Sequence, residues 1–203
     1  DSLKKKNYKK SKDHLQKSYA FTDNDRISLI IAEILKQYLF VFSENRIPNE
    51  KKKFGNLSFI NEVFQRCYLN DKNVKSYFKK LVNTPGETDY SRYIFFYINY
   101  LIENNSYNEA KEITDNLNYL NSSLLISQGK KWIEDQKLKE FKKIFSCKNS
   151  NDIVSEFFFL VANLYSSQGN YEKSNFYLNV SHYFNPKFIF NLSLLAENYY
   201  LNE

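Results

Sequence analysis

Apolar residues recur at intervals of three and four along most of the chain, which is the period of a helix with one buried face. The pattern is clear in residues 91–123, where Ile94, Tyr97, Ile98 and Leu101 share one face. The 203 residues include only four Gly and three Pro. Sandwiches and barrels need turn residues roughly every 8–12 positions, so this scarcity argues against an all-β fold. The sequence therefore predicts an all-α protein with long helices and short connections.

Several further segments follow the same period. Residues 27–42 predict one strongly apolar helix, residues 57–82 a helix pair and residues 122–145 a weaker pair. Gly129, within the weaker pair, is interpreted as the small residue at a helix crossing. The polar residues 43–56 are expected to form a loop or a poorly ordered partner helix. Asn151 or Asp152 is expected to cap the helix that follows.

The clearest pattern lies between Ser155 and Pro186, which read SEFFFLVANLYSSQGNYEKSNFYLNVSHYFNP. It predicts two helices separated by a turn at Gly169, with Ser174 small enough to let them approach closely. The same frame returns 34 positions further on. The matching positions are Phe158, Val161, Ala162 and Tyr165 in the first copy, and Leu192, Leu195, Ala196 and Tyr199 in the second.

This segment resembles the tetratricopeptide repeat (TPR), a helix–turn–helix unit of 34 residues. The resemblance implies one right-handed α-solenoid of stacked antiparallel helix hairpins across residues 1–203. Residues 1–56 would form irregular N-terminal helices and a loop, and residues 57–203 would form stacked pairs. The best-matched repeats are 91–123 and 155–188, and 189–203 is an incomplete one. Because the chain begins and ends within repeats, we expect a segment of a longer array. The Lys-, Asn- and Phe-rich style resembles TPR proteins of A/T-rich bacteria.

In TPR proteins the first helices line a concave groove that binds a peptide or protein partner. Asn99 and Asn163 fall where peptide-binding repeats hold a partner's backbone. Lys and Arg are almost missing from the groove positions, so a partner with an acidic C-terminus is not supported. The groove residues implied by the resemblance are Arg92, Phe95, Asn99, Glu103, Glu156, Phe159, Asn163, Ser167, Phe190 and Glu197.

The formal net charge is +6, and residues 1–20 carry most of it, with seven Lys against Asp1 and Asp13. A nucleic-acid-binding solenoid would carry basic residues along every repeat, so nucleic acid is not the expected partner. A helical-repeat RNA-binding module remains an alternative because of this basic first helix. Another alternative is an accessory TPR region of a larger enzyme or a cell-envelope assembly protein.

Residues suited to catalysis are few. His14 and His182 are the only histidines, and neither they nor Cys67 and Cys147 show metal-ligand spacing. The two cysteines are expected to be buried free thiols. No apolar run is long enough to span a membrane. We therefore expect a non-catalytic interaction or scaffold segment without a cofactor. The compartment stays open between the cytoplasm and, if a signal peptide has been removed, the periplasm or cell envelope.

Overall fold

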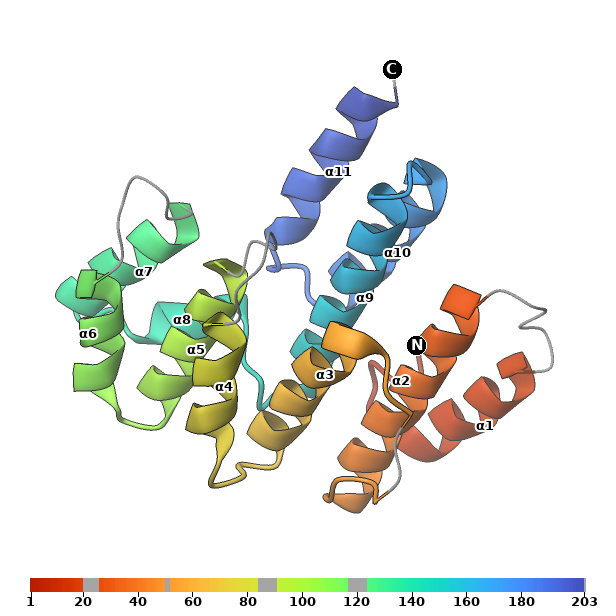
Figure 1. Ribbon diagram of the computed structural model, residues 1–203, viewed down its shortest axis with the longest axis horizontal. Helices are drawn as coiled ribbons and strands as arrows, with labels where there is room; N and C mark the ends of the chain where they lie inside the picture. Colours follow the sequence, from red (N-terminus) through yellow and green to blue (C-terminus); the bar gives the residue numbers. More distant parts are fainter. Residues whose placement is uncertain (20–25, 50–51, 84–90, 117–123, 203) are drawn as a thin grey trace.

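The computed structural model describes residues 1–19, 26–49, 52–83, 91–116 and 124–202. Within these ranges the backbone forms eleven helices and no strand, so the predicted all-α class is confirmed (Figure 1). The helices are α1 (Tyr8–Tyr19), α2 (Arg26–Glu44), α3 (Gly55–Tyr68), α4 (Val74–Val82), α5 (Ser91–Glu103), α6 (Tyr107–Asn116), α7 (Leu124–Glu134), α8 (Lys139–Ile144), α9 (Ser150–Ser166), α10 (Tyr171–Phe184) and α11 (Phe190–Leu201).

The helices fall where the apolar period predicts them. Gly169, between α9 and α10, has a φ of +72°, a conformation that glycine adopts without steric cost. Ser174 is fully buried at the crossing of this pair. Gly129 on α7 lies close to Phe141 of α8. A Cβ atom at position 129 would lie 3.2 Å from Cε1 of Phe141, so a larger residue would not fit without a shift. Small residues thus set the close approach of neighbouring helices.

Helix α9 lies at the centre of the molecule. Its sequence is apolar on nearly every side, and such a helix is stable only when it is covered all round. Besides α10, it packs against α2, where the rings of Tyr38 and Phe157 are 6.0 Å apart, and against α3 and α5. In a linear solenoid each helix pair contacts only its neighbours. The sequential contacts expected from the sequence run from α1 to α7 and stop there, because α9 returns to α2 and α3 (Figure 1).

A cluster of phenylalanine rings joins these parts. Phe145, which follows α8, lies with its ring centroid 3.9 Å from that of Phe96 and 5.6 Å from that of Phe64. Phe188, which precedes α11, packs against Phe145 and, at 5.7 Å, against Phe159. Aromatic rings bury large apolar areas, so the two connecting segments act as core elements here.

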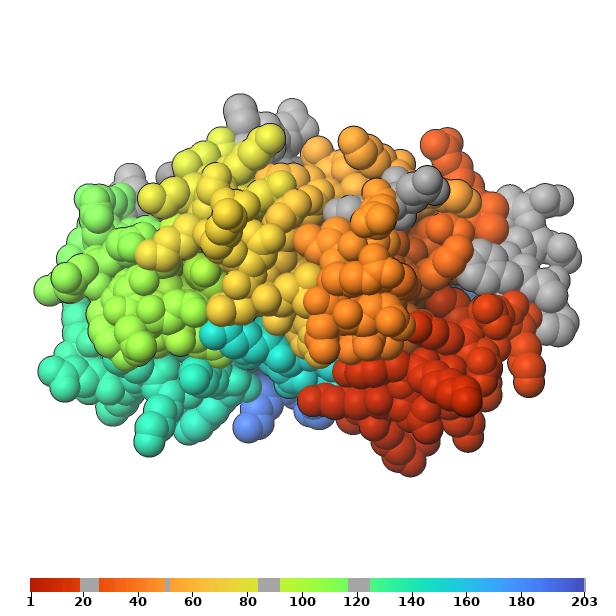
Figure 2. Space-filling view, turned by 90° about the horizontal axis from the view of Figure 1, so that it is seen from below, coloured from red at the N-terminus to blue at the C-terminus, as the bar shows by residue number. Residues whose placement is uncertain are grey.

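Cys67 of α3 and Cys147, just before α9, form a disulfide, and both are buried. Their Cα atoms are 5.8 Å apart, within the usual range for a disulfide. The prediction of free thiols is wrong because α9 returns to α3 across 80 positions of sequence. Figure 2 shows the cyan start of α9 between the yellow-orange α3 and the red N-terminal residues. Asn151 there donates to the Lys4 carbonyl.

The N-terminus of α9 differs from the expected one. Asn149 is the capping residue, and its side chain accepts a hydrogen bond from the backbone N–H of Asn151 at 3.2 Å. Asp152 lies in the first turn instead, where its Oδ2 accepts from the backbone N–H of Ser146 at 2.8 Å. The helix thus begins slightly earlier than predicted, and Asp152 fastens the segment that contains Cys147.

Burial raises the pKa of Asp152 from 3.8 to about 6, although the hydrogen bonds from Ser146 and Asn149 oppose the shift. Because the folded pKa exceeds the unfolded one, the folded state holds an extra proton between these values. The stability that this proton contributes is complete below about pH 4 and is lost as pH rises through about 6. We expect wild type to gain about 2 kcal/mol over Asp152→Asn between pH 7 and pH 4, measured by urea unfolding. An equal difference between the two proteins at both pH values contradicts the assignment.

Candidate interaction surface

The ten residues expected to line a groove differ widely in exposure. Phe95, Asn99, Glu156 and Phe159 are buried. Different parts of the chain cover them. Glu156 is covered by Arg92 and Tyr93, and Phe159 packs on Phe188 and Phe190 at α11. Phe95 packs on Trp132 of α7 and Phe141 of α8. For these four residues the groove expectation is corrected, because a partner cannot reach them in the folded protein.

Arg92 and Glu156 form an ion pair inside this contact. The Nε atom of Arg92 donates to both carboxylate oxygens of Glu156 at 3.1 Å, and Nη2 donates to Oε1 at 3.0 Å. The hydroxyl of Tyr93 also donates to Oε1, at 3.0 Å. The exposed fraction is 12% for the Arg92 side chain and 1% for that of Glu156. The guanidinium lies over the ring of Phe159, 4.5 Å from its centroid. The pair is thus hydrogen-bonded and stacked, as a buried ion pair must be.

The electrostatics of the pair follow from this burial. Burial raises the pKa of Glu156, and the Arg92 guanidinium offsets only part of the shift. Burial alone would lower the pKa of Arg92, but the Glu156 carboxylate outweighs it and the net shift is upward. Burial, together with Glu156, also raises the pKa of Tyr93. The cluster therefore holds protons at Tyr93 and Arg92, and it behaves as a structural element of the core.

Asn99 also bonds within the chain. Its Nδ2 atom donates to the backbone carbonyl of Phe145, which belongs to the ring cluster. An Asn at this repeat position was expected to hold the backbone of a partner. In this structure it holds the backbone of its own chain, at the segment that leads into Cys147 and α9.

Four of the six remaining residues lie along a narrow strip between α9 and α11. Asn163 on α9 and Ser167 just after it are exposed, Glu197 is exposed on α11, and Phe190 is half-buried at the base of α11. The two helices lie side by side, since the rings of Phe159 and Phe190 are 6.3 Å apart and Ser166 donates to Asn198 at 2.6 Å. Glu103 is half-buried at the end of α5. The structure therefore brings three accessible polar residues together in this strip.

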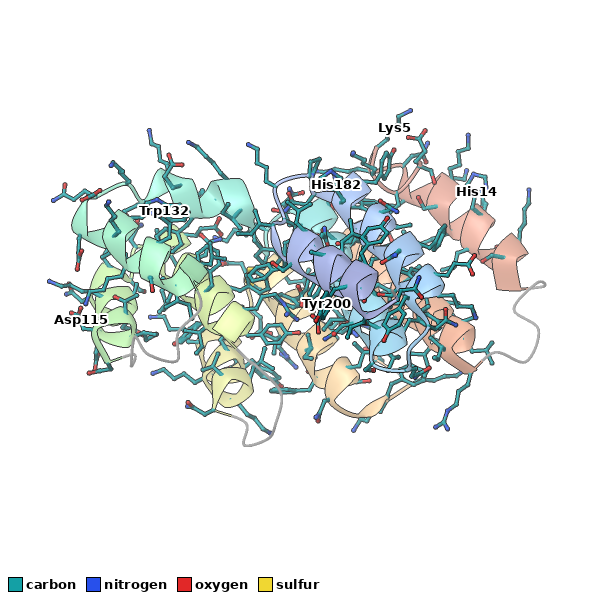
Figure 3. The ribbon with its side chains drawn as sticks, turned by 90° about the horizontal axis from the view of Figure 1, so that it is seen from above. Lys5, His14, Asp115, Trp132, His182 and Tyr200 are labelled. Atoms are coloured by element: carbon teal, nitrogen blue, oxygen red, sulfur yellow. A yellow bond between two sulfur atoms is a disulfide. The ribbon has the colours of Figure 1, made fainter. Side chains whose placement is uncertain are left out.

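A more prominent surface lies on the opposite side of α11. Leu192, Ala196 and Tyr199, spaced by four and three, share one helical face, which we call the outer face of α11. Leu192 is 60% exposed and Tyr199 61%. Figure 3 shows the helix from above, with the neighbouring Tyr200 labelled. Of the ten large hydrophobic side chains that are exposed in the described residues, eight lie between Leu164 and Leu201. Exposed apolar side chains therefore concentrate at this end of the molecule.

The residues that lie 34 positions before the outer face indicate what kind of surface could pack on it. Its equivalents in α9 are Phe158 and Tyr165, 34 positions earlier. Both stack on Tyr177 of α10, with ring centroids 5.9 and 5.6 Å away. In the part of the chain that the structure describes, no ring stacks on Tyr199. The repeat pattern aligns Leu192 and Tyr199 with Phe158 and Tyr165 within an incomplete repeat, and that alignment was the signal for this surface.

Seven lysines make residues 1–20 basic, and three of them bond within the molecule. Lys4 donates to the backbone carbonyl of Tyr183, Lys5 pairs with Asp1 at 2.9 Å, and Lys12 pairs with Glu44 at 3.1 Å. The Lys12 pair joins α1 to the end of α2, and the Lys4 bond joins the segment before α1 to α10.

Comparison with protein-family models, with curated proteins and with solved structures finds no match. Among the described residues, no helix is long and apolar enough to cross a membrane. No group of metal-binding side chains gathers in the same ranges. Both cysteines belong to the disulfide, and His14 and His182 are exposed on separate helices (Figure 3). A paired Cys–His nucleophile is therefore not formed.

Proposed function

We propose that this chain is a non-catalytic protein-interaction module made of helix hairpins similar to tetratricopeptide repeats. Its binding surface is the outer face of α11, and its partner supplies an α-helix. The observation that carries the proposal is the exposure of Leu192 and Tyr199 at positions where α9 packs on α10. The short, sequential hairpins α3–α4, α5–α6 and α9–α10 are consistent with a repeat-derived scaffold.

The geometry of α9 and α10 indicates what the partner helix must present. Tyr177 lies between Phe158 and Tyr165, and the rings of Tyr177 and Tyr165 are only 2° from parallel. A partner helix with an aromatic residue at its centre would occupy the same place between Leu192 and Tyr199. Helix-in-groove recognition uses apolar residues at this spacing as anchors. The class of partner is therefore an amphipathic helix with a central aromatic anchor.

The polar strip contributes in a different way. Asn163, Ser167 and Glu197 offer hydrogen bonds to water-exposed groups, which contribute less to affinity than buried apolar anchors. We expect it to adjust orientation rather than to supply most of the binding free energy.

The helix α10 provides a defined probe for the outer face. A peptide with the sequence of residues Tyr171–Phe184, locked as a helix, should bind the intact protein with a Kd below about 1 mM. The double variant Leu192→Asp/Tyr199→Asp should weaken binding at least about 10-fold, because it places charge where the aromatic ring of the peptide packs. Fluorescence anisotropy of the labelled peptide measures both values.

Two matched controls sharpen this test. Lys142→Gln changes an exposed residue on α8 instead of α11 and should leave the affinity unchanged. A peptide with Ala in place of Tyr177 should lose most of its affinity for wild type. Equal binding to wild type and to the double variant, or no binding at all, overturns the proposal. Far-ultraviolet circular dichroism confirms that each variant is folded.

The disulfide narrows the compartment in which this module works. Disulfides form and persist in oxidising environments such as the periplasm and the cell surface. Of the two compartments left open by the sequence, the buried bond between Cys67 and Cys147 favours the periplasm or cell envelope. Mass spectrometry of the protein isolated from its source under thiol-blocking conditions tests this assignment, and two blocked thiols would contradict it.

A further inference from the structure

A cavity of about 370 Å³ opens between α4, α5 and α6, away from the outer face of α11. Its apolar wall comes from Val82 at the end of α4, Ile94 and Tyr97 on α5, and Ile113 on α6. Ile94 and Ile113 are only partly buried, so they offer apolar surface to a ligand. The volume suits a small organic molecule.

Tyr97 lines this cavity and carries a polar atom that the fold does not satisfy. The residue is 2% exposed, its ring stacks on Phe78 at 5.3 Å, and its hydroxyl finds no hydrogen-bond partner in the described part of the chain. Burial raises the pKa of Tyr97 to about 12, so the hydroxyl keeps its proton at neutral pH. A buried hydroxyl without a partner destabilises the fold, and a ligand atom in hydrogen-bonding distance would remove this cost.

Two opposite charges stand at the rim of the same cavity. Lys79 comes from α4 and Glu112 from α6, and neither has an ion-pair partner among the residues that the structure describes. The other carboxylate at the rim, Glu109, is already paired with Lys75 at 2.5 Å. The charges left available to a ligand are therefore one cation and one anion, on different helices.

We propose that this cavity binds a small zwitterion, an α-amino acid whose side chain is apolar and ends in a hydrogen-bonding group. The carboxylate of the ligand pairs with Lys79 and its ammonium group pairs with Glu112. The apolar body packs on Val82, Ile94 and Ile113, and the terminal polar atom bonds with the Tyr97 hydroxyl. Within the part of the chain that the structure describes, the Tyr97 hydroxyl has no hydrogen-bond partner and Lys79 and Glu112 have no ion-pair partner, and each of these groups meets one polar group of the ligand.

A matched set of probes tests the two charges separately. L-tyrosine carries both charges, tyramine lacks the carboxylate and 3-(4-hydroxyphenyl)propanoate lacks the ammonium group. Saturation-transfer NMR and calorimetry on the 203-residue protein should show L-tyrosine binding at least about 10-fold more tightly than either singly charged analogue. Equal binding of the three compounds, or no binding of L-tyrosine up to its solubility limit, overturns the proposal.

Single substitutions assign the contacts. Lys79→Gln should remove the advantage of L-tyrosine over tyramine, and Glu112→Gln should remove its advantage over the acid. Tyr97→Phe should abolish the preference for L-tyrosine over L-phenylalanine. Glu172→Gln, on α10, is the control and should change nothing. Lys79 and Glu112 are exposed or near the surface, so their variants should keep wild-type circular dichroism. If L-tyrosine binds but all three variants bind it like wild type, the cavity is not the site.

Discussion

Removal of the disulfide between Cys67 and Cys147 should lower the free energy of unfolding by about 4 kcal/mol. The bond closes a loop of 80 positions, and a cross-link of that length removes much of the conformational entropy of the unfolded chain. Both sulfur atoms are buried, so two Ala side chains would also leave a small cavity in the core. Guanidinium unfolding of Cys67→Ala/Cys147→Ala beside wild type measures the loss. An effect of this size is a large share of the stability of a typical domain.

Reduction supplies the matched control for this double variant. Wild type unfolded in the presence of a reductant should have a midpoint well below that of the oxidised protein and no lower than that of the double variant, because both lack the cross-link and reduced wild type keeps its two sulfur atoms in the core. Since the bond is buried, native wild type should react with the reductant only when it opens. Two titratable thiols in the native oxidised protein, or identical midpoints for wild type and variant, would contradict the assignment.

The second large effect concerns the ion pair between Arg92 and Glu156. Arg92→Met should cost about 3–5 kcal/mol, because it leaves the Glu156 carboxylate buried without its partner. The double variant Arg92→Met/Glu156→Gln should recover at least half of this loss. Gln keeps an oxygen that accepts the Tyr93 hydroxyl, and it carries no charge. Urea unfolding of the two variants and wild type measures both differences.

The decisive comparison is whether the double variant is more stable or less stable than Arg92→Met. If the double variant is less stable than Arg92→Met, then the carboxylate of Glu156 has a further partner and the pair is not the unit described. Glu156→Gln alone completes the cycle, which isolates the interaction between the two positions.

The sequence predicted the helices well because their signal is local. The period of apolar residues predicted helices in the segments that contain α5, α6, α9 and α10, and Gly169 marked a turn that needs a positive φ. The N-terminus of α9 was less well defined, since three neighbouring polar residues compete to cap it and Asn149 does so.

The contacts of α9 with α2, α3 and α5 were not predictable in the same way. The helical period shows that a face is apolar, but it does not show which distant segment covers it. For this reason Phe95 and Phe159 were assigned to a groove, and Cys67 and Cys147 were taken as separate thiols. The exposure of the outer face of α11 was not predicted for the same reason. Leu192 and Tyr199 match core positions of the repeat, and the sequence does not show whether a helix covers them. The match to a repeat identified residues that pack on a helix, without identifying the helix.

The return of α9 to α3 also determines when the disulfide can form during synthesis of the chain. Ribosomes add about 5–20 residues per second, so the 80 positions between Cys67 and Cys147 take on the order of ten seconds to translate. During that interval α3 has left the ribosome while its disulfide partner does not yet exist, and Phe64 lacks the ring of Phe145 that covers it. The nascent N-terminal helices therefore pass through a period in which an apolar surface and an unpaired thiol are both open to other molecules.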